Sequence, residues 1–197
     1  QITSAEKIPE AVAKAFYFAK SGRPGPVLLD ITKDAQFGEL EYSYSKMASI
    51  RSYIPYPKLD GEAVDRAAEL INSAKKPLLL VGQGVLLSGA QEELKAFVEK
   101  TGIPVASTLL GLSAFPSSHP LFTGMLGMHG NYAPNINTNK CDLLIGLGMR
   151  FDDRVTGNLK TYAKQAKVIH IEIDRAEIDK NVKSDVAVIS DAKQALQ

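Results

Sequence analysis

From about residue 59 to residue 197 the chain alternates short apolar runs with segments of helical periodicity, and this alternation limits the fold more than any other feature. Residues 77–81 are continuously apolar, and residues 143–147 and 168–173 are similarly rich in aliphatic side chains. Strands that are covered on both faces of a parallel sheet have this composition. The intervening helical segments supply the covering layers, so the pattern predicts an α/β fold.

Two further runs, residues 103–106 and 186–189, complete the alternation. Helices are expected to begin near Asp60 and at Ser190 or Asp191, and Ser88 with Gln91 fits a capping box before a helix that Gly102 ends. The predicted architecture is a doubly wound, Rossmann-like parallel sheet of about five or six strands.

The first 58 residues follow a different pattern. A helix is expected from Ser4 to Gly22, followed by a short buried strand at residues 27–31. One helix and one strand cannot form a domain by themselves, so we expect the chain to be part of a longer protein. Residues 37–58 contain several tyrosines and are predicted to be an ordered linker.

Composition argues against a nucleic-acid partner and against a membrane partner. Lys and Arg total 23 and Asp and Glu total 22, which gives a net charge of +1 and no support for a nucleic-acid partner. No apolar run approaches the roughly 20 residues that cross a bilayer, and no signal peptide is recognisable, so we expect a cytoplasmic protein without a membrane partner. The single cysteine, Cys141, precedes an apolar run and is interpreted as core packing.

Ligands of doubly wound sheets bind beyond the carboxyl ends of the strands, so the residues after each strand are the candidates for function. Gly82-Gln83-Gly84 follows the first strand and would let a diphosphate approach the backbone, although a plain tight turn explains it equally well. Arg150 and Arg154 follow the third and suit a phosphate, the alternative being a surface ion-pair cluster.

Two acidic residues occupy comparable positions. Glu172, near the end of the next strand, fits a hydrogen bond to an adenosine ribose, and Asp191 either contacts a ligand or caps the last helix. No nucleophile and base stand at catalytic spacing, and no metal-ligand set is recognisable around His129. The residues therefore predict a nucleotide-binding domain without catalytic machinery of its own.

Several segments resemble the acetolactate synthase family of thiamine-diphosphate enzymes. Residues 22–30 with Lys33-Asp34 resemble the end of the N-terminal pyrimidine-binding domain of such enzymes, and residues 125–130 and 148–157 resemble acetolactate synthase specifically. The resemblance extends over essentially the whole chain. It implies residues 1–36 from the N-terminal thiamine-pyrimidine-binding domain, a linker at 37–58, and a central FAD-binding domain at 59–197.

The resemblance also implies a function. The full enzyme would condense two 2-oxoacids, pyruvate with pyruvate or 2-oxobutyrate, with loss of carbon dioxide, for branched-chain amino acid synthesis. Thiamine diphosphate and magnesium would be held by residues outside this chain, which is expected to be inactive alone. A homo-oligomer, dimer or tetramer, and a regulatory small subunit would be partners. FAD would be bound by Arg23, Gly82, Gln83, Gly84, Thr108, Leu109, Leu126, Gly127, Met128, His129, Gly148, Met149, Arg150, Asp152, Arg154, Val155, Glu172, Ile173, Asp191 and Ala192.

Two positions depart from the family pattern: Leu110 stands where a Gln is expected, which removes a polar contact to the flavin portion, and Thr32 stands where a Pro is expected. The alternatives are the central domain of another thiamine-dependent enzyme, such as a glyoxylate carboligase or an oxalyl-CoA decarboxylase, and an NAD-binding domain of sirtuin-like fold. The single cysteine disfavours the last, which would need zinc ligands. A mainly structural role in subunit contact is a further alternative.

Overall fold

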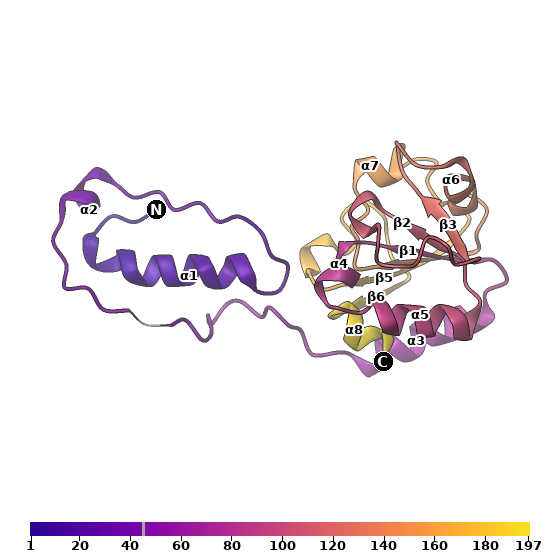
Figure 1. The fold of residues 1–197 in the computed structure, drawn as a ribbon, viewed down its shortest axis with the longest axis horizontal. Helices are drawn as coiled ribbons and strands as arrows, with labels where there is room; N and C mark the ends of the chain where they lie inside the picture. Colours follow the sequence, from indigo (N-terminus) through magenta and orange to yellow (C-terminus); the bar gives the residue numbers. More distant parts are fainter. Residues whose placement is uncertain (45) are drawn as a thin grey trace. The chain divides into compact units, whose positions relative to one another are not determined.

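The computed structural model describes residues 1–44 and 46–197, which divide into two compact units (Figure 1). The N-terminal unit comprises Gln1–Tyr56 and the C-terminal unit comprises Pro57–Gln197.

The C-terminal unit is built on a six-stranded sheet in which every neighbouring pair is parallel. The strand order is β3-β2-β1-β4-β5-β6, so the chain starts in the middle of the sheet, runs to one edge, and returns to the middle to build the other half. This is the order of the Rossmann fold, and it confirms the predicted fold class. The strands are β1 (Pro77–Val81), β2 (Val105–Ser107), β3 (Phe122–Met125), β4 (Leu143–Leu147), β5 (Lys167–Glu172) and β6 (Val186–Ile189).

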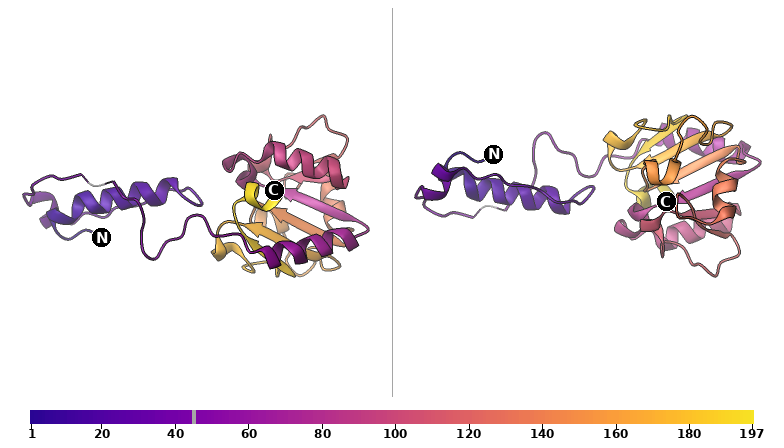
Figure 2. Two further views of the ribbon diagram at one scale, coloured as in Figure 1. Left: turned by 90° about the horizontal axis from the view of Figure 1, so that it is seen from below. Right: turned by 90° about the horizontal axis from the view of Figure 1, so that it is seen from above.

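Helices cover both faces of this sheet (Figures 1 and 2). One face, called here the α3 face, packs against α3 (Gly61–Ser73), α4 (Gln83–Leu87), α5 (Gln91–Thr101) and α8 (Ala192–Leu196). The opposite face, called the α6 face, carries α6 (Tyr132–Thr138) and α7 (Asp153–Thr156). Two 3-10 turns, η2 (Leu109–Gly111) and η3 (Arg175–Glu177), lie in loops after strands.

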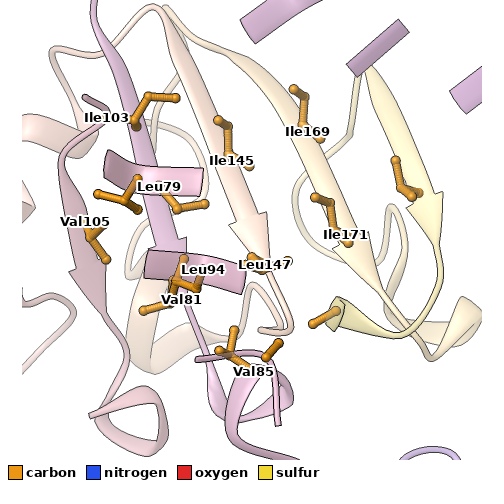
Figure 3. Close-up of a cluster of buried hydrophobic side chains, with 14 of the residues drawn as sticks. Leu79, Val81, Val85, Leu94, Ile103, Val105, Ile145, Leu147, Ile169 and Ile171 are labelled. Atoms are coloured by element: carbon orange, nitrogen blue, oxygen red, sulfur yellow. The ribbon is translucent and has the colours of Figure 1, made fainter. Parts of the chain in front are cut away.

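Alternation along each strand divides the core between the two faces. In β1, Leu79 and Val81 belong to the cluster on the α3 face, where Figure 3 shows them between side chains of β2 and β4, whereas Leu78 and Leu80 belong to the cluster on the α6 face. Burying each such side chain contributes about 1.5–3 kcal/mol. The continuous apolar runs in the sequence follow from this burial on both sides.

The N-terminal unit contains η1 (Ala5–Lys7), α1 (Ile8–Lys20) and α2 (Lys33–Phe37). The prediction of a buried strand at residues 27–31 is wrong: the segment is extended but forms only one parallel bridge, Ile2 with Ile31, and Leu28 is 92% exposed. Among the described residues of this unit there is no sheet for the segment to join, so Val27 and Leu28 remain exposed. Tyr53 packs on Phe18 and donates its hydroxyl hydrogen to the Ser21 carbonyl at 2.7 Å.

Three local features differ from what the sequence indicates. Ser88 does not begin a capping box, because α4 occupies residues 83–87 and the hydroxyl of Ser88 donates back to the Val85 carbonyl; α5 begins at Gln91 without a side-chain cap. Ser4 precedes η1 without forming a cap bond. Strand β3 was not predicted, since its four residues are all half-buried and include Gly124. Gly102, in contrast, ends α5 in the expected left-handed conformation.

Candidate functional site

All six strands are parallel, so their carboxyl ends meet at one edge of the sheet, called here the carboxyl edge. Every residue of the C-terminal unit that was predicted to bind FAD lies at or just after a strand end. These residues form six segments, one per strand: 82–84, 108–109, 126–129, 148–155, 172–173 and 191–192. Arg23, the remaining predicted residue, lies in the N-terminal unit, in the turn after α1.

The loops after β1 and β4 lie side by side, because these two strands are neighbours at the point where the strand order reverses. The Gly82 amide donates to the Leu147 carbonyl at 3.0 Å and the Gly84 amide donates to the Gly148 carbonyl at 2.9 Å. A Cβ at Gly82 would lie 2.3 Å from the Gly148 oxygen, and one at Gly84 would lie 2.6 Å from the Gly148 Cα. Glycines are thus needed here for the two backbones to pack on each other, a reason that sequence spacing alone did not reveal.

The segment after β4 alternates between core and surface. Met149 and Phe151 turn back into the cluster on the α6 face, where each is only 4% exposed. Arg150 and Asp152 therefore point outward, with side chains that are 51% and 31% exposed. Gly146 of β4 leaves room for the returning side chains, since a Cβ there would meet Phe151 Cζ at 3.0 Å and Met149 Sδ at 3.1 Å.

The charged groups of this segment form a loose ion-pair cluster on the surface. Arg150 Nη2 lies 3.3 Å from Asp152 Oδ2, and Arg154 Nε lies 3.8 Å from Asp153 Oδ2. Exposed pairs of this kind contribute little to stability, about 0–1 kcal/mol, so both guanidinium groups can bind another anion at small cost. Asp152 has a second role, because its Oδ1 accepts from the Arg154 amide and caps α7.

The loop after β3 is attached to the same segment. Gly127 has a φ of +100°, and its amide and carbonyl both bond to the side chain of Asn135 at 2.9 and 3.0 Å. The Met128 amide donates to the Arg154 carbonyl at 2.8 Å, and the Arg154 guanidinium lies 3.8 Å from the Met128 sulfur. The Met128 side chain is 60% exposed beside this contact.

The loop after β2 contributes one polar and one apolar group. The Thr108 hydroxyl accepts from the Gly111 amide at 3.1 Å and caps η2, while the Thr108 amide donates to the Val81 carbonyl of β1 at 2.9 Å. Leu109 is 68% exposed, and its neighbour Leu110, which was noted for its departure from the family motif, is also exposed. Large exposed apolar side chains next to polar loops are typical of a surface that binds something else.

At the far side of the edge, the two acidic residues are engaged with the backbone. Glu172 is 7% exposed, and its Oε1 accepts from the amides of Ile173 and Asp174 at 3.1 and 3.2 Å. Asp191 caps α8 by accepting from the Lys193 amide at 2.9 Å. Capping is the alternative that the sequence left open for Asp191, and Ala192 beside it is buried.

Side chains from distant elements hold these loops, and sequence reasoning missed them. Asn135 holds Gly127, His170 lies 2.8 Å from the Met149 carbonyl, and Asn181 donates to the Phe151 carbonyl at 2.8 Å. Asn135 lies eight residues after the glycine that it holds, whereas His170 and Asn181 contact segments that are 21 and 30 residues away and that the folded topology brings near. His170 in particular reads in the sequence as part of an apolar strand.

Two cavities of the C-terminal unit are lined by other residues. One of about 860 Å³ lies at the opposite edge, where the strands begin, and another of about 440 Å³ lies between the start of α5 and residues 112–117. Neither is lined by a residue predicted to bind FAD. Four lysines line the first, and since α3 and α5 end there, we attribute them to compensation of the negative helix ends. They are Lys75, Lys76, Lys100 and Lys140.

Known proteins match the C-terminal unit in one comparison and nearly the whole chain in another. Residues 64–197 match the family model described as "Thiamine pyrophosphate enzyme, central domain". The acetolactate synthase large subunit of Corynebacterium glutamicum is 47% identical over 195 residues, which are 99% of this chain and 31% of the relative. Acetolactate synthase 2, chloroplastic, of Nicotiana tabacum is 47% identical over 198 residues, which are 100% of this chain and 30% of the relative.

A solved structure has the same fold. A protein from Mycobacterium smegmatis, described as a thiamin diphosphate-dependent enzyme, superposes with a TM-score of 0.73 and 28% identity over 98% of this chain and 36% of its own. The chain thus spans about a third of the length of the proteins it matches. Within its described residues, no helix combines the length and apolarity that a membrane span requires. The match over 64–197 places the chain in the thiamine pyrophosphate enzyme family, as a carrier of its central domain.

Proposed function

We propose that the C-terminal unit binds FAD at the carboxyl edge of its sheet. The observation that carries the proposal is the convergence of six strand-end segments at one edge, with two exposed guanidinium groups beside the reversal of strand order. Doubly wound sheets bind dinucleotides at such a reversal. Arg donates paired hydrogen bonds to phosphate oxygens, so the donors present here fit a diphosphate.

The other groups at the edge fit the two ends of a flavin dinucleotide. Arg150 and Arg154 would hold the diphosphate, and the carboxylates of Glu172 and Asp191 would accept from the adenosine. The exposed side chains of Leu109 and Met128 would cover the flavin. Met149, Leu126 and Ala192 are buried, so they would contribute backbone atoms rather than side chains.

We further propose that the whole protein is an acetolactate synthase, on the strength of relatives that are 45–47% identical over essentially all of this chain. It would condense pyruvate with pyruvate or 2-oxobutyrate and release carbon dioxide. Thiamine diphosphate, anchored by magnesium, supplies the carbanion chemistry when bound, and its ligands would lie outside this chain. FAD in the central domain would do no net redox work.

The organisation around this domain is part of the same proposal. Residues 1–36 would belong to the pyrimidine-binding domain, where the exposed segment 27–31 would find the sheet that it lacks here. The relatives from Corynebacterium glutamicum and Methanocaldococcus jannaschii are named as large subunits, which supports a regulatory small subunit as partner. We also propose that the whole protein is a homo-oligomer and is located in the cytoplasm.

The test is equilibrium binding of FAD, ADP and NAD to the 197-residue chain, followed by quenching of flavin fluorescence and by calorimetry. FAD should bind more tightly than ADP, because the flavin adds contacts with Leu109 and Met128. Equal affinity for ADP and FAD would favour another thiamine-dependent enzyme, such as an oxalyl-CoA decarboxylase. Preference for NAD would overturn the proposal in favour of an NAD-binding domain, and binding of none would leave only the role in subunit contact.

A further inference from the structure

His170 lies in the middle of β5, on the α6 face of the sheet, and is completely buried. Its Nε2 is 2.8 Å from the carbonyl oxygen of Met149. A carbonyl oxygen only accepts, so Nε2 carries a hydrogen and donates it to the Met149 carbonyl. In the described part of the chain Nδ1 has no hydrogen-bond partner, so the bond to Met149 is the ring's polar contact.

The sheet around His170 is shaped to receive the loop after β4. Gly146 of β4 stands directly beside His170 in the strand register, and Ala187 of β6 stands on its other side. Both are small, which leaves space above the sheet for Met149 and Phe151. The Phe151 ring packs edge-on against the imidazole, with centroids 4.9 Å apart. The adjacent residues Gly146, His170 and Ala187 therefore provide space for the loop after β4 and one hydrogen-bond donor to it, the His170 imidazole.

This donor fixes the peptide unit that joins Met149 to Arg150. The same segment is held before it, where the Gly148 amide donates to the Ile171 carbonyl at 2.8 Å, and after it, where Asn181 donates to the Phe151 carbonyl at 2.8 Å. In contrast, the contact of the Arg150 guanidinium among the described residues is an exposed ion pair with Asp152. The location of the guanidinium therefore depends on the backbone of this segment, in which the His170 imidazole contacts the Met149 carbonyl.

We propose that His170 is a positioning residue for the cofactor site: by holding the Met149 carbonyl, it sets the direction in which Arg150 and the following turn of α7 face the dinucleotide phosphates. The inference rests on the proposed binding of FAD at the carboxyl edge. It adds a role for a buried side chain that does not touch the cofactor. Preorganised donors bind better because less freedom is lost on binding.

The test compares two amides of different reach in the 197-residue chain. In His170→Gln the side-chain NH2 stands close to the position of Nε2 and can donate to the Met149 carbonyl, whereas in His170→Asn the same group is too short. Both variants bury a side-chain amide, so a difference between them in the measured quantities reports on the hydrogen bond to the Met149 carbonyl. His170→Phe, which keeps the ring without a donor, is the third variant. Ile145→Val, on the α3 face, is the control for general destabilisation.

Two quantities are measured: amide hydrogen exchange of residues 148–157 by mass spectrometry, and the Kd for FAD. We expect exchange to accelerate about tenfold and the Kd to rise about tenfold in His170→Asn and His170→Phe, the equivalent of one lost hydrogen bond, with parent-like values in His170→Gln and Ile145→Val. Equal effects of Gln and Asn, or exchange in these peptides that follows global stability in every variant, would overturn the proposal.

The exchange experiment needs no cofactor, so the two proposals fail separately. If the parent chain does not bind FAD, the proposed function is wrong, while exchange still decides whether His170 holds the loop. If FAD binds the parent and all three variants equally, the function stands and the positioning role is wrong.

Discussion

Ser113 has a backbone conformation that suits glycine. Its φ is +73°, and it lies in the irregular connection between β2 and β3 with its side chain exposed. A non-glycine residue in this region costs about 1 kcal/mol. We predict that Ser113→Gly raises the free energy of unfolding by about 0.5–1 kcal/mol, measured by urea denaturation. Ser117→Gly, at an exposed serine without positive φ, should lower it slightly; stabilisation by both would contradict this account.

Gly148 requires glycine for two reasons, its positive φ and its close packing on another backbone segment, whereas Gly102 requires it for its positive φ alone. Gly148 and Gly102 both have positive φ, +56° and +70°, but a Cβ at Gly148 would lie 2.8 Å from Gly84 Cα, whereas one at Gly102 meets nothing within 4 Å. Gly102→Ala should therefore cost only about 1 kcal/mol of stability, from backbone strain. Gly148→Ala should cost on the order of 1–3 kcal/mol more, because the two loops must separate. Equal losses in thermal unfolding would show that the loops are not tightly packed.

The buried imidazole of His170 makes stability depend on pH. Burial lowers the pKa of His170 from its ordinary 6.5, against the opposing effects of the Met149 carbonyl and the carboxylates of Asp179 and Glu177, which themselves face Lys183 and Lys180. The unfolded chain takes up a proton near pH 6.5, and the folded chain does so only at lower pH. Acid therefore favours unfolding, and stability is lost as pH falls below 6.5.

The expected outcome is a steeper acid loss in the parent than in His170→Gln, which cannot titrate there. The difference in unfolding free energy between the two proteins should change by up to about 1.4 kcal/mol per pH unit below pH 6.5. Urea denaturation at pH 7.5 and 5.5 measures it. A difference that is constant with pH would mean that the folded protein protonates His170 freely.

At the scale of elements, the sequence predicted the strands that are buried on both faces. The bounds of β1, β4 and β6 agree to the residue, because each is a largely aliphatic run that follows a charged residue and ends just before a glycine or a serine. Strand β3 was not predicted, because Phe122–Met125 is only half-buried and contains a glycine with positive φ. Helix α4 was not predicted, because Gly82-Gln83-Gly84 has the composition of a turn. In the structure Gln83 and Gly84 already belong to the helix.

The segment after β4 carries the two arginines of the proposed cofactor site, and two substitutions test it. Arg150→Ala and Arg154→Ala should each weaken FAD binding by on the order of 1–3 kcal/mol, the loss of a charge-assisted hydrogen bond, without changing the fold. Arg66→Ala, at an exposed arginine of α3, is the control and should bind like the parent. Titration of flavin fluorescence measures all three. A double variant that binds like the parent would exclude the phosphate role.

At the scale of the whole molecule, the gathering of the candidate residues at one edge of the sheet could be predicted more readily than the directions of their side chains. A parallel sheet brings all strand ends to one edge, so candidates chosen after each strand necessarily gather there. What the sequence could not supply is which side chains face outward. Met149 and Arg150 are neighbours in the chain, yet one enters the core and the other faces solvent because Gly146 leaves space beneath the loop. That space exists only once β4 and β5 are paired.

The two units differ in how much apolar surface they bury, and this predicts how each behaves alone. The buried apolar residues in the described part of the N-terminal unit are Ile2, Ala5, Ala13 and Ala35, whereas the C-terminal unit has two extensive clusters. Little burial cannot offset the conformational entropy of ordering 56 residues. We therefore predict that residues 57–197 fold independently, with an unfolding free energy within about 1 kcal/mol of the whole chain.

The measurement is urea denaturation of both proteins, followed by far-ultraviolet circular dichroism and by exchange of the core amides of β1 and β4. A peptide of residues 1–56 should show no cooperative transition, because Phe16 and Leu28 are exposed and α1 has no sheet to cover. Loss of the transition in 57–197 would contradict the prediction, and would mean that the first 56 residues stabilise the sheet. Retention of FAD by 57–197 would further show that Arg23 is dispensable for binding, whereas its loss with the fold intact would place part of the cofactor site in the N-terminal unit.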